Sequence, residues 1–494
     1  MIRWMVAVLA GLAIVMSVWR LEGEAAGMRV EAVSFGSVPG RVYRPEGAAL
    51  GPVLVIAHGF AGSQQIMQSF ALSAARAGYV AVTYDLAGHG RNPAPLSGSV
   101  VDVAGATATL VAELTTVAQA ARGYGDGRVA VLGHSMASDI VVRFADATPA
   151  VQAVVAVSMF SPAVTAATPK NLLVITGAWE GMLSAEALRV VRLRVPDAVA
   201  GVTYGAPGDL RRAAVAPHVE HASVLFSTVA MGEAVGWLDQ AFGVTRAVPR
   251  VADRGGWIVL LLAGAVALGW PLARLLPQLA DRPVGAGLAG RRLWIVALVP
   301  MLAVPLVLRM LPTHFLPVLV ADYLAVHFLA YGLATLACLQ AVGAPLPQVT
   351  GRGLLAGVMA AGFVAVALFF PVDRYLTNFW PGSAGRAIII GAMAVGTFAF
   401  FWAVDWAGRG GGRWASLVLK LGFLVSLAIA VGLDFERLFF LLIILPIVVI
   451  FFAIFGLLGW WVGGRTRHPL PGAVMAGFAF AWALGVTFPM LSAG

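Results

Sequence analysis

The sequence is poor in charge. Charged residues make up 12% of its 494 residues, whereas an ordinary soluble domain has about 25%. Hydrophobic residues reach 60%, against about 45–50% in such a domain, and the mean hydropathy is +0.87. These values exclude a disordered chain, a nucleic-acid-binding tail protein and a simple cytosolic enzyme. They indicate an integral membrane protein that also has room for a soluble part.

Cysteine is nearly absent as well. Cys338 is the only one, so no intrachain disulfide can form, and its apolar surroundings predict a small buried side chain. The sequence has no cluster of His, Cys, Asp and Glu with metal-ligand spacing and no glycine loop suited to a phosphate. We therefore expect neither a metal nor a cofactor.

The net charge of +9 is unevenly distributed. Residues 22–255 hold 17 basic and 18 acidic residues, whereas residues 256–494 hold 14 basic and 6 acidic ones. The basic excess thus accompanies the apolar segments, as in loops that flank a membrane, and does not form a nucleic-acid surface. The expected partner is the lipid bilayer and not a nucleic acid.

The chain begins with a candidate anchor over residues 1–21. Arg3 precedes an apolar run from Trp4 to Trp19, which is typical of a signal peptide or a signal anchor. Small residues at 23–26 would permit cleavage, but the tryptophans that bracket the run resemble interfacial residues. We favour an uncleaved anchor.

Residues 256–494 predict a membrane domain. Each of its apolar runs is close to the ~20 residues that cross a ~30 Å hydrocarbon core. Eight runs meet this criterion: 257–273, 293–311, 316–339, 353–371, 386–406, 415–432, 438–461 and 471–489. With the first anchor they make nine spans.

Arginines predict the orientation. If the N-terminus is cytoplasmic, the cytoplasmic loops hold nine arginines and the opposite side holds four. The cytoplasmic set is Arg274, Arg282, Arg291, Arg292, Arg352, Arg409, Arg413, Arg465 and Arg467, and the other is Arg309, Arg374, Arg386 and Arg437. This places the region 22–250 on the extracytoplasmic side of the cell (inner) membrane.

Between the two apolar parts, residues 22–250 predict an α/β domain. A leading hairpin is expected over Met28–Phe35 and Arg41–Arg44, joined through residues 37–40. Further strands are predicted at Val53–Ala57, Val80–Tyr84, Val129–Leu132, Ala153–Ser158, Asn171–Thr176 and Val199–Tyr204. Helices are predicted at Gln64–Ala77, Asp102–Arg122, Met136–Ala147 and Ala222–Phe242. This alternation favours a mostly parallel sheet with helices on both faces.

One strand of this domain runs into a nucleophile-like turn. Val129–Leu132 is followed by Gly133-His134-Ser135-Met136-Ala137 and then by a helical stretch. This is close to the Gly-x-Ser-x-Gly elbow, whose small residues allow a sharp strand-to-helix turn that exposes the serine hydroxyl. Ala137 replaces the last glycine and is small enough for the same contact.

A second apolar strand also runs into a turn that contains small residues. Val53–Ala57 leads into His58-Gly59-Phe60-Ala61-Gly62-Ser63, and Tyr84-Asp85-Leu86-Ala87-Gly88-His89-Gly90 follows the next strand. With the elbow, these motifs resemble the α/β-hydrolase superfamily, most closely its bacterial esterase and dienelactone-hydrolase-like members. The resemblance covers residues 28–243, and it implies an α/β-hydrolase fold followed by an all-α transmembrane bundle.

The resemblance also implies a site. The family orders its catalytic groups Ser, acid, His, so Ser135 is the implied nucleophile and Glu180, in place of the usual aspartate, the implied acid. The histidine belongs before the last helix, where both His218 and His221 lie, and His221 is favoured because it adjoins that helix. The backbone N–H groups of Phe60 and Met136 are the implied oxyanion hole. His58 and His134 are expected to be scaffold residues, and Asp85, Asp102 and Asp139 to be cap or surface carboxylates.

The predicted function is a membrane-anchored serine hydrolase of the esterase or lipase type that cleaves an ester or other acyl bond through an acyl-enzyme. An acyltransferase with the same triad, or a non-catalytic membrane sensor or transporter with a hydrolase-like domain, remain alternatives. Residues 159–170 are too few for a helical lid, so an open site and a small-molecule or lipid-like acyl substrate are expected.

The membrane domain contains a few polar side chains within its apolar runs. Tyr323, His327 and Tyr331 share one helix face beside Asp322, and Asp405 and Lys420 are placed to pair. For these residues, hydrogen bonding between helices is favoured over a proton pathway.

Overall fold

The computed structural model describes residues 1–47, 49–98, 103–245, 247, 250–412 and 414–492. Asp102, a predicted helix start, and Arg413, one of the loop arginines, lie outside these residues. The chain divides into two compact units. The α/β unit consists of Val15–Leu261, Val372–Gly382 and Pro489–Gly494, and the helical unit of Met1–Ile14, Leu262–Pro371 and Ser383–Phe488. The α/β unit therefore extends beyond the predicted range of 22–250 at both ends and takes in two further segments.

The α/β unit is built on one sheet. Within the described residues it has nine strands in the order β1-β2-β4-β3-β5-β6-β7-β9-β8. The strands are β1 (Met28–Phe35), β2 (Val38–Pro45), β3 (Val53–Ala57), β4 (Val80–Tyr84), β5 (Val129–His134), β6 (Val151–Val157), β7 (Leu172–Gly177), β8 (Thr203–Ala206) and β9 (Asp209–Ala216). Strands β4, β3, β5, β6, β7 and β9 pair in parallel, while β1–β2, β2–β4 and β8–β9 are antiparallel. This confirms the predicted fold class.

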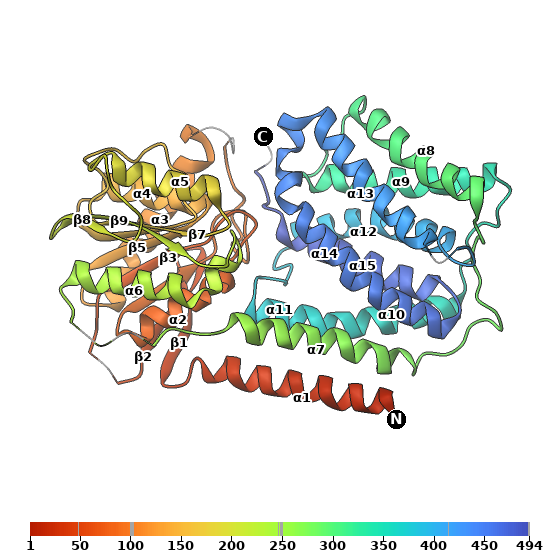
Figure 1. Ribbon diagram of the computed structural model, residues 1–494, viewed down its shortest axis with the longest axis horizontal. Helices are drawn as coiled ribbons and strands as arrows, with labels where there is room; N and C mark the ends of the chain where they lie inside the picture. Colours follow the sequence, from red (N-terminus) through yellow and green to blue (C-terminus); the bar gives the residue numbers. More distant parts are fainter. Residues whose placement is uncertain (48, 99–102, 246, 248–249, 413, 493–494) are drawn as a thin grey trace. The chain divides into compact units, whose positions relative to one another are not determined.

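Helices cover both faces of the sheet, which explains why β3, β4 and β5 are buried along their whole length and are mostly apolar. One face packs against α3 (Ala108–Ala121), α4 (Met136–Ala147) and α5 (Gly181–Arg192). The other packs against α2 (Gln68–Arg76) and α6 (Thr228–Phe242). Figure 1 shows these two helical layers with the sheet between them. Helix α5 was not among the predicted helices.

Two strands differ from the prediction. β2 begins at Val38, so Val38–Gly40 pair with β1 and the turn is at Gly36 and Ser37. A side chain at Gly40 would come within 2.7 Å of the Phe35 ring, so this glycine serves close packing and not a turn. β7 pairs with β6 on one side and with β9, which was not predicted, on the other. β8 covers only the end of the predicted strand Val199–Tyr204 and forms an edge hairpin with β9.

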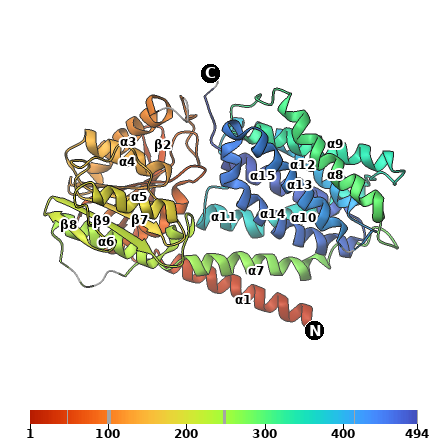
Figure 2. The ribbon, with the colours of Figure 1, turned by 45° about the horizontal axis from the view of Figure 1, so that its top comes forward.

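The predicted spans correspond to long helices. Among the described residues, nine helices are long and apolar enough to cross a membrane. They are α1 (Ile2–Gly23), α7 (Gly255–Ala273), α8 (Gly290–Arg309), α9 (Ala321–Ala341), the continuous run Gly351–Tyr375 with α10 (Gly351–Val364) and α11 (Phe370–Tyr375), α12 (Ala384–Ala407), α13 (Ala415–Leu433), α14 (Phe435–Thr466) and α15 (Leu470–Thr487). Figure 2 shows α7 running alongside α1, as does the first view.

Close backbone contacts and polar side chains join neighbouring helices in the core of the helical unit. A side chain at Gly396 of α12 would meet the carbonyl oxygen of Ala325 in α9 at 2.2 Å, which requires a small residue there. His327 Nε2 lies 3.1 Å from Ser426 Oγ of α13, and Lys420 Nζ lies 3.1 Å from Asp405 Oδ1. These polar side chains therefore bond between helices, as the favoured interpretation expected.

Candidate active site

Ser135 lies at a strained turn between β5 and α4. Its φ of 53° and ψ of −118° are rare for a residue with a side chain, and such strain is characteristic of a nucleophile elbow. A side chain at Gly133 would approach the carbonyl oxygen of Ala137 to 2.3 Å, so glycine is required before the turn. Ala137 itself is fully buried, and its methyl group fits where the motif usually has glycine.

Three residues from separate loops meet at this turn. His221 Nε2 lies 2.8 Å from Ser135 Oγ, and His221 Nδ1 lies 2.7 Å from Glu180 Oε1. β5, β7 and β9 end at the same edge of the sheet, and these residues follow those strands. The structure thus brings Ser135, Glu180 and His221 together in the geometry of a catalytic triad.

The carboxylate of Glu180 is held by more than the histidine. Its side chain is 4% exposed, and Oε2 accepts hydrogen bonds from the N–H of Gly177 at 2.7 Å and from Ser158 Oγ at 2.8 Å. Burial acts to raise the pKa of Glu180, but the hydrogen bonds from His221, Gly177 and Ser158 outweigh it and leave the pKa below its ordinary value. Glu180 is therefore an anion that orients the His221 ring. Ser158 was not a predicted site residue.

His134 supports the loop that carries His221 through a hydrogen bond. Its Nε2 lies 3.0 Å from the carbonyl oxygen of His221, so the neutral ring donates its Nε2–H there. Burial, followed by the nearby His221, lowers the pKa of His134 to about 3. A neutral, hydrogen-bonded ring fits the scaffold role expected of it.

The turn after β3 lies against the elbow. A side chain at Gly59 would come within 3.0 Å of Ser135 Cβ and 2.9 Å of His134 Nδ1, so only glycine allows this approach. Phe60 follows in the same turn, and Met136 is the first residue of α4, where backbone N–H groups have no partner within the helix. Both predicted oxyanion donors therefore belong to segments that border Ser135.

A polar network fixes the other end of this turn. Ser63 Oγ accepts a hydrogen bond from the N–H of Asn378 at 2.8 Å and lies 3.0 Å from Thr377 Oγ1. Arg91 donates to Asn378 Oδ1 at 3.1 Å and to Asp373 Oδ2 at 2.7 Å. Residues 372–382 are thus part of the support of the turn, although they follow the α/β segment by more than a hundred residues.

The C-terminal residues join the same unit. The N–H of Met490 donates to the carbonyl oxygen of Gly88 at 2.9 Å, and the N–H of Leu96 donates to the carbonyl oxygen of Met490 at 2.8 Å. A side chain at Gly88 would meet that Met490 oxygen at 2.6 Å, which explains the glycine after β4. Neither this segment nor residues 372–382 carried a recognisable local motif.

The remaining candidates lie apart from the reacting groups. His218 is exposed, with φ of 58°. Asp85 accepts hydrogen bonds from the backbone N–H groups of Gln64 and Arg91, and Asp139 pairs with Arg143 at 2.8 Å. His58 accepts the N–H of Leu86 through Nε2 at 3.1 Å.

The site has no helical lid over residues 159–170, all of which the structure describes. Instead, three large apolar side chains are exposed on the segments that follow β6 and β7. Phe160 is 67% exposed, Trp179 69% and Met182 88%. Each lies within two residues of Ser158 or Glu180 in the sequence, and we call these three side chains the apolar rim.

The comparisons with known proteins agree with this architecture. A sequence profile of the family described as serine aminopeptidase, S33, matches residues 50–226. The chain carries an α/β-hydrolase domain. The family match and the strand order of the sheet confirm the α/β-hydrolase resemblance inferred from the motifs. This domain is followed by helices long and apolar enough to cross a membrane.

Solved structures similar to the hydrolase domain include dienelactone hydrolase from Anabaena variabilis, with 18% identity over 44% of this chain and 98% of the other and a TM-score of 0.31. TT1662 from Thermus thermophilus has 15% identity over 44% and 99% of the two chains and a TM-score of 0.33. A hypothetical protein from Pseudomonas aeruginosa has 12% identity over 44% and 94% and a TM-score of 0.34. The fold of the domain is established by the family match and by the order of its strands. No curated protein sequence matches the chain.

Proposed function

We propose that the protein is a membrane-anchored serine hydrolase that cleaves an ester or other acyl bond through an acyl-enzyme. The observation that carries this proposal is the continuous hydrogen-bonded series from Glu180 through His221 to Ser135, with distances of 2.7 and 2.8 Å. The matched family is described as a serine aminopeptidase, so an amide bond is a candidate as well as an ester bond.

The geometry supports a two-step mechanism. His221 Nε2 takes the proton of Ser135 Oγ as the oxygen attacks the carbonyl carbon of the substrate. The N–H groups of Phe60 and Met136 receive the oxyanion, and each such donor stabilises the transition state by roughly 3 kcal/mol. His221 then protonates the leaving group, which leaves Ser135 acylated. In the second step His221 deprotonates a water that attacks the acyl carbon. His221 then returns this proton to Ser135 Oγ as the acyl C–O bond breaks, which releases the acid and restores the serine.

We place the hydrolase domain on the extracytoplasmic side of the cell (inner) membrane. The nine-to-four arginine bias supports this orientation. If the nine candidate spans alternate, the segments at 372–382 and 489–492 fall on the same side as residues 24–254. Both segments belong to the α/β unit, which is consistent with that count.

For the substrate we favour a lipid-like acyl compound. Phe160, Trp179 and Met182 expose apolar surface at the rim of an open site, and such surface is suited to an acyl chain. The adjoining candidate spans would keep the domain close to membrane-embedded substrates, which increases their effective concentration.

The test is covalent labelling of the purified full-length protein by an alkyl fluorophosphonate, followed by a screen of acyl esters. The wild type should be labelled and Ser135→Ala should not. His221→Gln should abolish turnover, whereas His218→Asn should retain it, because His218 is exposed and asparagine tolerates its φ of 58°. Equal labelling of the wild type and Ser135→Ala would refute the proposal.

A further inference from the structure

A cavity of the α/β unit, separate from the triad, is lined by arginines. It has a volume of about 320 Å³ and lies between the end of α1, the strands β1 and β2, helix α2 and the segments around residues 254 and 374. Its polar lining consists of Glu22, Arg41, Tyr43, Gln68, Arg254, Arg374 and Tyr375. None of these residues belongs to the catalytic machinery described above.

Arg254 is the unusual member of this lining. It is 2% exposed, and neither Nε nor Nη1 has a hydrogen-bond partner among the described residues. Within the described part of the chain, its side chain makes one hydrogen bond, a long one from Nη2 to the carbonyl oxygen of Tyr375 at 3.5 Å. Burial lowers the pKa of Arg254 to about 10, so the side chain still carries its charge at neutral pH. A buried cation with unused donors is costly unless an anion accompanies it.

The carboxylates near Arg254 are already engaged by other arginines. Glu22 accepts two hydrogen bonds from Arg374, each of 2.7 Å, and Glu24 lies 2.7 Å from Arg76. Arg41 has no ion pair or side-chain hydrogen bond within the part of the chain that the structure describes. The cavity therefore has two positive charges, on Arg41 and Arg254, without a matching acid.

Neutral donors complete the lining. The Tyr43 hydroxyl is buried and has no hydrogen-bond partner among the described residues. With two guanidinium groups and the Gln68 amide nearby, the cavity offers several N–H and O–H donors in one place. Guanidinium groups bind the oxygens of a phosphate in bidentate fashion, so this donor set suits a phosphate group.

The cavity also lies where candidate spans begin and end. Glu22 is near the end of α1, Arg254 directly precedes α7, and Arg374 is near the end of the span Gly351–Tyr375. Arg20 stacks over the ring of Trp257 at 5.3 Å, and such Arg and Trp side chains are typical of the headgroup level of a bilayer. Lipid phosphates lie at the same level, so a phosphate-bearing headgroup would be close to the cavity.

We propose that this cavity is a binding site for an anionic phosphate group, carried by a lipid headgroup or free in solution. The bound phosphate supplies the negative charge that Arg254 and Arg41 lack. Phosphate binding would stabilise the α/β unit at the point where it joins the ends of α1 and α7. This proposal is independent of the catalytic activity.

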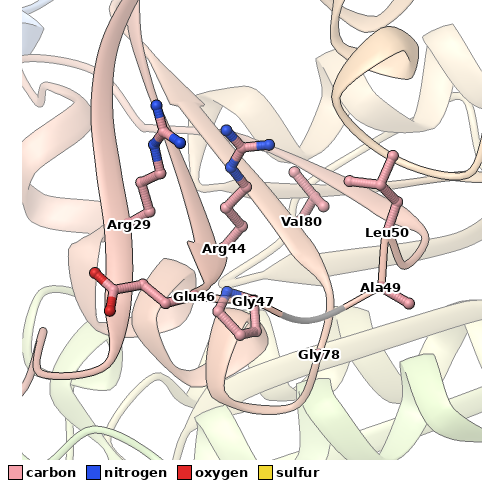
Figure 3. A pocket seen from close by; sticks show the side chains of 9 residues that line it. Arg29, Arg44, Glu46, Gly47, Ala49, Leu50, Gly78 and Val80 are labelled. Carbon is pink, nitrogen blue, oxygen red and sulfur yellow. The ribbon is translucent and has the colours of Figure 1, made fainter.

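A cleft at the edge of the sheet is also lined by arginines, but there each arginine has an acidic partner. Figure 3 shows Arg29 and Arg44 beside it, extending from β1 and β2. Both are ion-paired with Glu31, and their side chains are 64% and 27% exposed. These arginines are balanced and partly solvated, so this cleft carries no similar proposal, and Arg44→Gln is a matched control that removes the same charge elsewhere.

The experiment measures thermal unfolding of the full-length protein in a neutral detergent by tryptophan fluorescence. The probes are inorganic phosphate, a short-chain phosphatidylglycerol, a monoacylglycerol of equal chain length that lacks phosphate, and sodium chloride at the same ionic strength. We expect a saturable rise in melting temperature with a phosphate-bearing probe, because a ligand stabilises the state that binds it. Arg254→Gln should abolish this rise and Arg44→Gln should keep it.

The outcomes distinguish a lipid headgroup from free phosphate as the source of the bound group. A response to phosphatidylglycerol alone identifies a lipid headgroup, and an equal response to inorganic phosphate shows that the free anion is sufficient. If Arg254→Gln does not fold, Arg41→Gln should weaken binding by about tenfold or more, and Tyr43→Phe should weaken it less. Responses no larger than those to sodium chloride and monoacylglycerol, or unchanged in the Arg254 and Arg41 variants, would overturn the proposal.

Discussion

The N–H of Asn378 donates a hydrogen bond of 2.8 Å to the hydroxyl oxygen of Ser63, a residue that precedes it by 315 positions. Ser63 ends the turn that carries Phe60, one of the two proposed oxyanion donors. Asn378 is itself held through Oδ1 by Arg91. A segment between two candidate spans is thereby coupled to the part of the site that must be placed most accurately.

Replacement of Ser63 by alanine should impair catalysis more than substrate binding. The hydroxyl is fully buried and has contacts with both Asn378 and Thr377, so its loss frees the end of the oxyanion turn. A small displacement of a catalytic donor can lower the rate constant by roughly 10- to 100-fold. We expect a fall in kcat of this order with little change in KM, measured on a soluble ester.

The matched control for that experiment is Ser69→Ala. Ser69 is equally buried, lies on α2, and its hydroxyl has no hydrogen-bond partner among the described residues. Its replacement should leave kcat near the wild-type value. Equal kcat values for Ser63→Ala and wild type would show that the turn does not depend on residues 372–382.

Glu180→Gln should leave the fold intact and nearly abolish turnover. The amide cannot hold His221 in the tautomer that accepts the serine proton, and loss of the carboxylate in such a triad lowers kcat by roughly 10⁴-fold. Glu186→Gln is the control, because Glu186 pairs with Arg189 one turn further along the same helix, α5, apart from the hydrogen bonds of the triad. If Glu180→Gln retained most of the activity, another group would have to orient His221.

Much of this site could be predicted from local patterns. The elbow combines an apolar strand, small residues and a following helix, and the structure has α4 at the predicted residues 136–147. Strands β3 and β4 also match their predictions, because short apolar runs that are buried on both faces stand out in the sequence. The same reasoning found the spans to within a few residues, since long apolar runs are the strongest signal in the chain.

Other parts depend on tertiary contacts that leave no local pattern. β9 was missed because Arg211 and Arg212 interrupt its apolar sequence, yet Arg211 is buried and donates to the carbonyl oxygens of Val190 and Thr168. Ser158 supports Glu180 only because β6 and β7 are neighbours in the sheet. Residues 372–382 and 489–492 are short, and no periodicity assigns them to the α/β unit.

Acidification should destabilise the protein through His134. Burial keeps the pKa of His134 near 3 in the folded protein, against 6.5 for an ordinary histidine. Below pH 6.5 the unfolded chain takes up a proton that the folded state excludes, so stability falls as the pH decreases toward 3. The loss is at most about 1.4 kcal/mol for each pH unit in this window.

The variant His134→Gln tests this prediction. Glutamine can still donate to the carbonyl oxygen of His221 but does not titrate. Melting temperatures measured from pH 7.5 to pH 5 should fall less steeply for the variant than for the wild type. Parallel curves would show that His134 takes no part in the acid sensitivity.

Cysteine accessibility can test the orientation of the full chain. Cys338 is buried and can be replaced by alanine, after which single cysteines are introduced at Glu46, exposed in the α/β unit, and at Gln278, exposed in the loop after α7. In intact spheroplasts a membrane-impermeant maleimide should label Glu46→Cys at once. It should label Gln278→Cys only after permeabilisation, and the reverse pattern would contradict the proposed topology.

The apolar rim makes a prediction about substrate choice. Trp179 is 69% exposed and adjoins Glu180, so its indole can cover part of a bound acyl chain while the triad acts on the carbonyl group. Burying apolar surface contributes about 25 cal/mol per Å², so loss of one large ring should cost more for a long chain than for an acetyl group. Trp179→Ala should therefore raise KM for long-chain esters several-fold and leave kcat/KM for an acetyl ester almost unchanged.

The acetyl ester is the internal control, because any damage to the neighbouring Glu180 would lower its hydrolysis as well. If the variant lost activity on both esters by the same factor, Trp179 would support the triad and not the acyl chain, and the preference for lipid-like substrates would lose its structural basis.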